Sequence, residues 1–431
     1  MTNHMNNDTI CAPTTATGGA IAMIRISGPQ SMEVLSAIFS KDLSEAQPNT
    51  VHYGFILSHK KETIDEVMAS IFRAPHSYTG EDCVELSCHG SRYIINKVLE
   101  LLVENGCRMA APGEFTQRAF LNGKMDLSQA EAVADLIASE SASAHRMAMN
   151  QLRGEFSSEL ANLRQQLLNL TSLLELELDF TDQDVEFADR SNLKDLCMLI
   201  EQRISRLTQS FRTGNALKNG VPVAIIGAPN VGKSTLLNAL LHDDKAIVSE
   251  IYGTTRDLIE DTIQIQGITF RFIDTAGIRH TNDKIEKMGI ERSQQAASRA
   301  QIIIMMSEPD VPEPEIAIRP EQKVIHILNK SDRFQAINGL GLAQLEKELA
   351  ESVGVPQEGE VIVSNQRHYE ALTLALEDIR RVQSGLATYL PTDLIAIDLR
   401  QCLHHLAEIT GGEITTDEVL GTIFSKFCVG K

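Results

Sequence analysis

The segment GAPNVGKST, residues Gly227–Thr235, decides the fold of the middle of this chain. It matches the phosphate-binding pattern G-x-x-x-x-G-K-[S/T]. The apolar run before it, Val221–Gly227, predicts a buried parallel strand, and the run after it, Thr235–Leu241, predicts a helix. In that context, backbone N–H groups of the turn bind phosphate oxygens, Lys233 reaches the outer phosphates and Ser234 holds Mg²⁺. The predicted contacts of this loop are Asn230, Val231, Gly232, Lys233, Ser234 and Thr235.

Two motifs further along the chain predict that the nucleotide is a guanine nucleotide. The motif DTAG follows the apolar run ITFRFI, so Asp274 is expected at a strand end, where it can hold Mg²⁺ through water, while the Gly277 amide meets the γ-phosphate. The motif NKSD follows VIHIL, another predicted strand. Its Asp332 carboxylate can accept two hydrogen bonds from guanine, and adenine would leave that buried group unpaired. The predicted contacts at the two motifs are Asp274, Thr275, Ala276, Gly277, Asn329, Lys330 and Asp332.

Between the phosphate loop and DTAG lies GTTRD, residues Gly253–Asp257, which is typical of a switch segment. Thr255 is expected to complete the Mg²⁺ shell there. Each short string is weak by itself, but all four in this order predict a GTPase.

Two departures from the usual GTPase pattern stand out. Ras-like enzymes carry a water-orienting Gln after the DTAG glycine, whereas this chain has Ile278, which leaves Asp283, Glu286 and Glu291 as acidic alternatives. A GTPase of this kind also has a final strand and a base-covering loop after NKSD. Here the sequence predicts a helix after Gly341 and no such strand, so we expect a nucleotide pocket that is incomplete or differently closed.

The composition predicts a reduced, cytoplasmic protein. The 431 residues carry a net charge of −19, which argues against a broad nucleic-acid-binding face, so any RNA contact is expected to be local or shared with a partner. Seven cysteines without a C-x-x-C pair predict neither a disulfide framework nor a zinc ribbon. The first residues lack the pattern of a signal peptide, and the apolar run Ile302–Met306 is too short to cross a membrane.

The pattern along the chain predicts a multidomain fold. Residues 1–122 indicate an α+β domain, because strand-like and helical runs alternate there. The strand-like runs are Ala20–Ser27, Val51–Leu57, Glu66–Arg73 and Cys83–His89, and the helical stretches lie near Met32–Phe39 and Ile94–Glu104. Residues 123–213 predict long helices, with one apolar stripe at three- and four-residue spacing from Leu152 to Leu174. Residues 214–359 are the predicted α/β P-loop GTPase domain, and helical periodicity returns in residues 360–431. We therefore expect one all-α helical domain that is interrupted by an inserted GTPase domain.

The whole chain resembles the bacterial tRNA modification GTPase MnmE (TrmE) family. Besides the GTPase motifs, the resemblance rests on segments in every other region. These are AMIRISG (Ala22–Gly28), YTGEDCVELSCHG (Tyr78–Gly90), APGEFTQRAFLNGKMDLSQAEAVADLI (Ala111–Ile137), NQRHYEAL (Asn365–Leu372) and FSKFCVGK (Phe424–Lys431).

The resemblance implies GTP hydrolysis that is stimulated by K⁺. In the family, two GTPase domains meet across a homodimer, and K⁺ takes the place of an arginine finger, where a cation neutralises transition-state charge. On this pattern Glu286 orients the attacking water; the other reading of Glu286 is an exposed helix acid that pairs with a neighbouring lysine. The K⁺ ligands implied by the family are Asn230, Ser249, Ile251 and Thr254.

The resemblance also implies a folate site in the N-terminal domain, which the family uses for dimerisation and for binding a 5-formyltetrahydrofolate. Arg25, Glu85, Lys124 and the final Lys431 fall at the family's positions. A carboxylate can accept hydrogen bonds from the pterin amino edge, and cations suit anionic or carbonyl groups. The alternative for Arg25 and Glu85 is an ordinary ion pair on a strand surface.

Cys428 is the best candidate for a reactive thiol, because Lys426 and Lys431 are close in sequence and a nearby cation favours thiolate. Two other readings stay open: a small apolar residue that packs the last segment, or part of a terminus that holds a ligand. Adjacent Cys88 and His89 are expected to be structural, since neighbours on a strand point to opposite faces.

The resemblance further implies a dimeric GTPase that works with a flavoprotein of the MnmG (GidA) type. The implied reaction adds an aminomethyl-type group to carbon 5 of the wobble uridine of certain tRNAs, with no role for a membrane. Two other functions remain: a ribosome-assembly GTPase, and a regulatory scaffold whose GTPase only times assembly. The motifs predict GTP or GDP and Mg²⁺ as cofactors, and the resemblance implies K⁺ and 5-formyltetrahydrofolate in addition.

Overall fold

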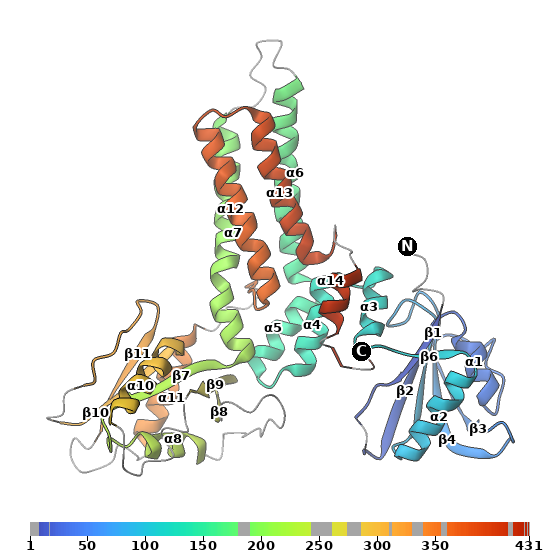
Figure 1. Cartoon of the computed structure of the whole chain (residues 1–431). Coiled ribbons are helices and arrows are strands. Elements are labelled where there is room, and N and C mark those ends of the chain that lie inside the picture. Colours follow the sequence, from blue (N-terminus) through green and yellow to red (C-terminus); the bar gives the residue numbers. More distant parts are fainter. Residues whose placement is uncertain are drawn as a thin grey trace. The chain divides into compact units, whose positions relative to one another are not determined.

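The structure, a computed structural model, describes residues 8–16, 18–179, 190–242, 261–273, 286–309, 313–329, 339–354, 360–412, 417–425, 427, 428 and 430. The chain forms two compact units (Figure 1). Unit 1 comprises Met1–Ala134 and Ala407–Lys431, and unit 2 comprises Asp135–Leu406. The four predicted domain segments are grouped differently from these units, and their boundaries stay predictions.

Unit 1 is built around a six-stranded sheet in the order β3-β4-β5-β2-β1-β6. Neighbouring strands are antiparallel except β1 and β6, which are parallel. Alternation along the strands gives the sheet one buried face, as in β4, where Val67, Ala69 and Ile71 are buried and the residues between them are not. The strands are β1 (Thr9–Pro13), β2 (Ile21–Ser27), β3 (Thr50–Leu57), β4 (Thr63–Phe72), β5 (Cys83–His89) and β6 (Cys107–Met109).

Helices α1 (Ser31–Ile38) and α2 (Arg92–Glu104) contribute to the main core of unit 1, together with the buried face of the sheet. Helices α3 (Glu114–Leu121) and α14 (Asp417–Phe424) are in contact, although nearly three hundred residues separate them in sequence (Figure 1). The sequence patterns had predicted β2 to β5, α1 and α2, and the structure confirms these. They had not predicted β1, β6, α3 or α14.

The helices of unit 2 confirm the predicted apolar stripe. Phe156, Leu160 and the leucines that follow at three- and four-residue steps to Leu174 are buried along α6, and only Leu152, in the preceding helix, is half-buried. Helix α7 leads into the GTPase strands, and α12 follows them in sequence. These two helices pack together through the stacked rings of Phe211 and Tyr369, whose centroids are 4.4 Å apart. The helices of unit 2 before and after the strands are α5 (Ala142–Leu152), α6 (Glu155–Asp179), α7 (Arg190–Asn219) and α12 (Gln366–Ala387). Two further helices, α4 (Leu127–Ala138) and α13 (Thr392–Thr410), have residues in both units.

The sheet of unit 2 has the order β11-β10-β7-β9-β8, in which only β8 runs antiparallel to its neighbour. In the described part of the chain no strand follows β11, and α11 comes next, close to where the sequence predicted a helix. The elements are β7 (Val221–Gly227), α8 (Lys233–His242), β8 (Asp261–Ile265), β9 (Ile268–Phe272), α10 (Glu286–Arg299), β10 (Ile302–Ser307), β11 (Lys323–Leu328) and α11 (Gly339–Val353).

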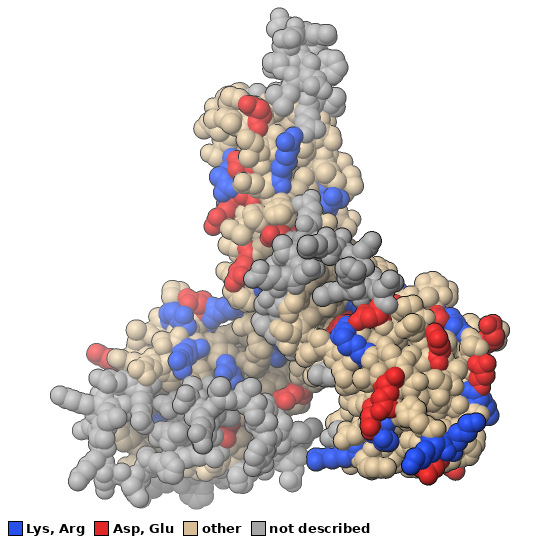
Figure 2. Space-filling view, turned by 45° about the vertical axis from the view of Figure 1, so that its right-hand side comes forward, with Lys and Arg blue, Asp and Glu red and all other residues tan. Residues whose placement is uncertain are grey.

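Charged side chains of both signs are mixed on the visible surface of each unit (Figure 2). None of the described helices is long and apolar enough to span a membrane.

Candidate functional site

The phosphate loop lies where strand β7 gives way to helix α8, as the sequence predicted. Its backbone requires unusual conformations: Gly232 has φ +103° and Asn230 has φ +64°, a region that asparagine tolerates better than most residues. Gly227 must be glycine for a different reason, because a Cβ there would lie 2.4 Å from the Met306 carbonyl oxygen. The loop is therefore held close to the neighbouring strand β10.

Lys233 folds back over this loop. Its Nζ donates to the carbonyl oxygens of Gly227 and Ala228, at 2.7 and 2.8 Å. Burial lowers the pKa of the Lys233 ammonium group from its usual value. The ammonium group thus lies at the mouth of the loop, where it can exchange carbonyl oxygens for phosphate oxygens.

Asn329, the first residue of NKSD, joins the base-recognition motif to the phosphate loop. Its Nδ2 donates to the Val231 carbonyl oxygen at 2.6 Å, and its backbone N–H bonds the Ser307 carbonyl oxygen at 2.8 Å. Strands β7, β9, β10 and β11 are parallel, so these strands end at the same edge of the sheet. The structure therefore brings Asn329 and the phosphate loop together.

Two of the predicted Mg²⁺ and K⁺ donors, Ser234 and Asn230, lie in the described part of the chain. Ser234 lies in the first turn of α8 and Asn230 in the loop, and a hydroxyl and an amide oxygen suit hard cations. Glu286 is the first residue of α10, and nothing is described of its side chain. The remaining predicted residues lie outside the described part of the chain: Ser249, Ile251, Thr254, Thr255, Asp274, Thr275, Ala276, Gly277, Lys330, Asp332 and Lys431.

In unit 1, Arg25 and Glu85 face each other across strands β2 and β5. Nε and Nη2 of Arg25 donate to Oε1 of Glu85 at 3.0 and 2.8 Å. Among the described residues, no contact involves Oε2 of Glu85, so this oxygen can accept from a ligand. The Arg25 guanidinium is covered by the rings of Tyr78 and Phe115, with centroids 4.9 and 5.4 Å from its Cζ.

Lys124 contacts the loop between β4 and β5, which carries Tyr78. Its Nζ donates to the Pro75 carbonyl oxygen at 2.9 Å, and its side chain is exposed. The structure therefore joins the three described residues of the predicted folate site through one ion pair and one loop. Tyr78 and Phe115 were not predicted; their place in the motifs that carry the family resemblance was the only signal for them.

The C-terminal tail reaches the same site. Gly430 has φ +95° and packs so closely on β1 that a Cβ would lie 2.3 Å from the Pro13 carbonyl oxygen. The carbonyl oxygen of Gly430 accepts a hydrogen bond from Nη1 of Arg25 at 3.5 Å. Two residues earlier, the Cys428 carbonyl oxygen accepts from the Gly113 N–H at 3.3 Å. Cys428 is exposed, whereas the other six cysteines are buried. Its thiol is therefore accessible, and does not pack as a small apolar residue.

Phe427 anchors the C-terminal tail. It is 9 % exposed and packs with Phe424, Leu420, Leu127 and Ala130. Cys88 and His89 do not pair with each other: Cys88 is buried, and burial raises the pKa of its thiol to about 11, whereas His89 is exposed and bonds Asp65.

The five-stranded sheet, the loop after β7 and the lysine at its mouth define a P-loop nucleotide-binding protein. A family model described as the MnmE helical domain matches residues 127–428, and one described as the GTP-binding protein TrmE N-terminus matches residues 9–124. The chain belongs to the MnmE family of tRNA modification GTPases.

Full-length relatives support this family. A protein of *Parabacteroides distasonis* is 55 % identical over 98 % of this chain and 100 % of its own length. One of *Bacteroides thetaiotaomicron* is 53 % identical over 99 % of this chain and 100 % of its own, and one of *Flavobacterium johnsoniae* is 47 % identical over 99 and 100 %. All three are called tRNA modification GTPase MnmE.

These alignments also show a difference in length between this chain and its relatives. They run over 472, 467 and 460 positions, more than the 431 residues of this chain, so the relatives contain residues that this chain lacks. Among solved structures, the cytosolic domain of the *T. maritima* FeoB iron transporter in a GDP form aligns with 44 % of this chain and 96 % of its own. Its identity of 14 % and TM-score of 0.19 carry no weight for the fold.

Proposed function

We propose that this GTPase, with a flavoprotein of the MnmG (GidA) type, adds an aminomethyl-type group to carbon 5 of the wobble uridine of certain tRNAs. Membership of the family carries the proposal, because relatives named for tRNA modification align with nearly the whole chain. In this proposal the protein acts in the cytoplasm as a homodimer, and its GTPase domain is inserted into the helical domain. A suitable test is mass spectrometry of tRNA from cells in which the gene is deleted, and from the same cells complemented with the gene. Unchanged wobble uridines would contradict the proposal.

GTP hydrolysis is proposed to use Mg²⁺ and K⁺. Lys233 and the loop amides hold the β- and γ-phosphates, Ser234 supplies a hydroxyl for Mg²⁺, and Asn230 supplies an oxygen for K⁺. A monovalent cation at this place neutralises charge that develops during phosphoryl transfer. We assign the orienting of the attacking water to Glu286. GTP turnover should be measured in K⁺ and in Na⁺ at equal ionic strength, and equal rates would contradict the cation site.

The site around Arg25 is proposed to bind 5-formyltetrahydrofolate. Oε2 of Glu85, which takes no hydrogen bond from the described residues, can accept from the pterin amino edge, and Lys124 can meet an anionic group. A one-carbon unit is the chemistry that folate supplies. The exposed Cys428 thiol is placed on the tail segment that also contacts Arg25. Calorimetry with 5-formyltetrahydrofolate tests the site, and the Glu85→Gln variant should lose affinity.

The homodimer is proposed to form through the sheet face of unit 1 that carries Arg25. The register places Met23, Ser87, Met68 and Tyr53 in one row across four strands, and Arg25 with Glu85 in the next row. This open face has large exposed apolar side chains, with 43 % of Met68 and 50 % of Tyr53 accessible. Apolar side chains gathered on one sheet face suit burial against a second copy.

The regulatory scaffold remains the second candidate, because the exposure of Cys428 shows an accessible thiol without showing its chemistry. The two functions differ in one variant. Replacing Cys428 by Ser should abolish tRNA modification if the thiol reacts, and should leave modification intact if the protein only times assembly.

A further inference from the structure

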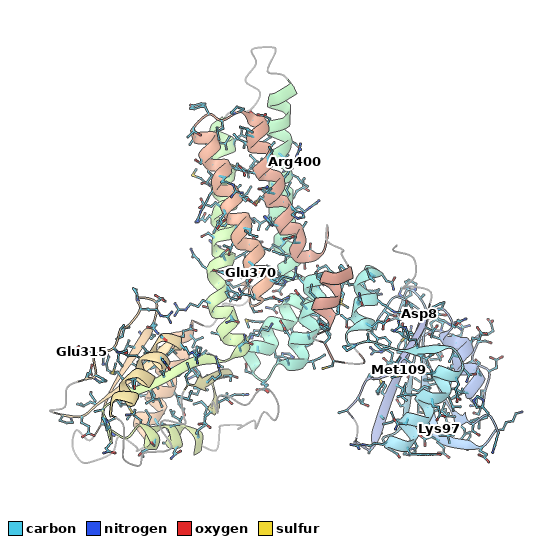
Figure 3. The ribbon with its side chains drawn as sticks, viewed as in Figure 1. Asp8, Lys97, Met109, Glu315, Glu370 and Arg400 are labelled. Atoms are coloured by element: carbon cyan, nitrogen blue, oxygen red, sulfur yellow. The ribbon has the colours of Figure 1, made fainter. Side chains whose placement is uncertain are left out.

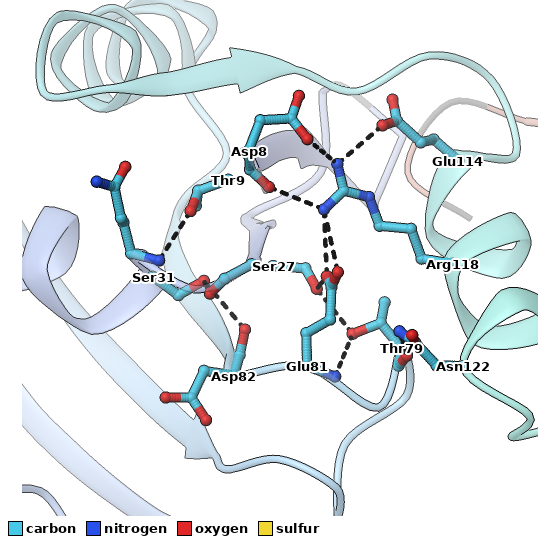
Figure 4. Close-up of polar contacts among 12 residues, drawn as sticks. Asp8, Thr9, Ser27, Ser31, Thr79, Glu81, Asp82, Glu114, Arg118 and Asn122 are labelled. Atoms are coloured by element: carbon cyan, nitrogen blue, oxygen red, sulfur yellow. Dashed lines mark hydrogen bonds and ion pairs between the residues drawn. The ribbon is translucent and has the colours of Figure 1, made fainter. Parts of the chain in front are cut away.

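Arg118, on helix α3, is a buried charge that no part of the proposed function uses. Its side chain is 2 % exposed and lies at the centre of a polar network (Figure 4). Its Nη2 donates to Oδ1 of Asp8 at 2.6 Å and to Oε1 of Glu114 at 3.1 Å. Its Nη1 donates to the Asp8 carbonyl oxygen at 2.9 Å and to both carboxylate oxygens of Glu81, at 3.2 and 3.3 Å.

Glu81 carries the network into the loop between β4 and β5. Its Oε2 accepts from the Ser27 hydroxyl at 2.7 Å, and this hydroxyl is 2.7 Å from Oγ1 of Thr79. The Thr79 carbonyl oxygen accepts from Nδ2 of Asn122 at 2.7 Å, just after α3. Figure 4 shows these contacts one after another, from Arg118 through Glu81 to Thr79 and Asn122.

The loop that is held in this way carries Tyr78, whose ring covers the Arg25 guanidinium. The Tyr78 hydroxyl is 2.8 Å from Oγ1 of Thr116, also on α3. Phe115, beside Thr116, covers the same guanidinium. One helix therefore supplies one aromatic cover of Arg25 itself and fixes the other through the loop.

We infer that Arg118 is a positioning residue of the one-carbon ligand site: through Glu81 it holds the Tyr78–Asp82 loop so that Tyr78 lies over Arg25. The inference rests on the proposed folate function for the identity of the ligand. Arg118 itself touches no part of the site, and it acts only through the loop. A planar guanidinium with donors in several directions meets three acidic residues at once, which a lysine ammonium group cannot reproduce.

Arg108 offers a matched control in the same network. It donates to Oδ2 of Asp8 and to both oxygens of Glu114, but it has no contact with Glu81. Removing Arg108 therefore breaks the same cluster without releasing the loop. A comparison of Arg118→Met with Arg108→Met separates loop positioning from general stability.

Calorimetry with 5-formyltetrahydrofolate should show affinity reduced about tenfold or more in Arg118→Met, an intermediate loss in Arg118→Lys and almost none in Arg108→Met. Hydrogen exchange should show faster exchange of the loop amides in Arg118→Met alone. The milder Asn122→Ala, at an exposed position, should shift both readouts in the same direction if Arg118→Met fails to fold. Equal effects of Arg118→Met and Arg108→Met, or unchanged loop exchange in Arg118→Met, would overturn the inference.

Hydrogen exchange also keeps the two proposals apart. If the wild-type protein does not bind 5-formyltetrahydrofolate, the proposed folate function fails. Faster loop exchange in Arg118→Met would then still support the positioning role, and unchanged exchange would overturn it.

Discussion

The side-chain amide of Asn329 donates to the carbonyl oxygen of Val231 at 2.6 Å, and this bond joins the base-recognition motif to the phosphate loop. Asn329 is 9 % exposed, so the bond is largely shielded from water. The space around it is tight, since a Cβ on Gly232 would lie 2.5 Å from Nδ2 of Asn329. Positions that we expect to contact two ends of a nucleotide are thus joined by a hydrogen bond before any nucleotide binds.

Replacing Asn329 by Ala should therefore weaken binding of both GDP and GTP. Loss of a buried hydrogen bond costs about 1–3 kcal/mol, which corresponds to roughly a tenfold loss of affinity or more. Calorimetry with GDP measures the effect, and Gln344→Ala, which removes an exposed bond on α11, serves as the control. Equal affinities of Asn329→Ala and wild type would contradict the role of this bond.

The nucleotide affinity of the wild-type chain should be lower than that of the *Parabacteroides distasonis* relative. Within the described residues no strand follows β11, and the alignment shows that this relative has residues which this chain lacks. A base that is covered less completely loses buried contacts. Parallel GDP titrations of the two proteins test this, and an equal or tighter dissociation constant here would refute it.

Gly430→Ala should detach the C-terminal tail from the Arg25 site. The added Cβ would meet the Pro13 carbonyl oxygen at 2.3 Å, and φ +95° is strained for any other residue. We expect weaker binding of 5-formyltetrahydrofolate and unchanged GTP turnover. The control is Gly421→Ala, since a Cβ at Gly421 meets nothing within 4 Å. A loss of affinity in both variants would point to α14 and not to the tail contact.

Acid should loosen the Asp8–Glu114 end of the network in unit 1. Burial alone would raise the pKa of Asp8, but hydrogen bonds from Arg108 and Arg118 more than offset this effect and hold the pKa below its usual value. Burial would also raise the pKa of Glu114, but hydrogen bonds from Arg108 and from the Ala111 N–H lower it below its usual value. A carboxyl with a lowered pKa stabilises the folded state above its unfolded-state value of about 4 and loses that contribution as the pH falls through the folded value.

Hydrogen exchange of α3 amides between pH 6 and pH 3 measures this effect, after correction for the intrinsic exchange rate. Protection should fall more steeply in wild type than in an Asp8→Asn, Glu114→Gln double variant, which has no charge left to lose. Parallel profiles in the two proteins would show that these carboxylates do not control the acid response. Asp8, labelled in Figure 3, lies directly before β1, so the N-terminal end of that strand should report the same change.

Met68→Lys should weaken the homodimer. A lysine on the open face would place a charge among the apolar side chains that we propose to be buried against a second copy. Sedimentation analysis over a range of concentrations gives the dimer dissociation constant. The control is Val103→Lys, at an exposed apolar residue on α2. A dimer as tight in Met68→Lys as in wild type would exclude this face as the interface.

The sequence predicted the elements whose signal is local. The stripe from Phe156 to Leu174 and the strand and helix on either side of the phosphate loop follow from spacing alone, and the structure confirms them. Strand β6 is only three residues long and pairs with β1, although four strands and two helices lie between them in the sequence. No local pattern reveals such a contact. Helix α3 was missed for a similar reason, because it buries polar residues such as Arg118 and Thr116 and has no plain apolar stripe.

The candidate sites were predicted to different extents. The phosphate loop has a motif with a mechanism, so its residues could be named from the sequence, and the structure brings Asn329 to it. For Arg25 and Glu85 only the family resemblance pointed to a site. Their cover by Tyr78, Phe115 and Gly430 depends on tertiary contacts between segments as many as 405 residues apart.

That separation has a consequence for the order of events during synthesis. The strands that carry Arg25 and Glu85 leave the ribosome early, but α14 and Gly430 leave it only after all of unit 2 has been made (Figure 1). Until then, the apolar surface that receives Phe424 and Phe427 has no partner from its own chain. The proposed folate site can therefore be completed only at the end of translation, so a prematurely terminated chain could fold its first sheet without gaining a complete site.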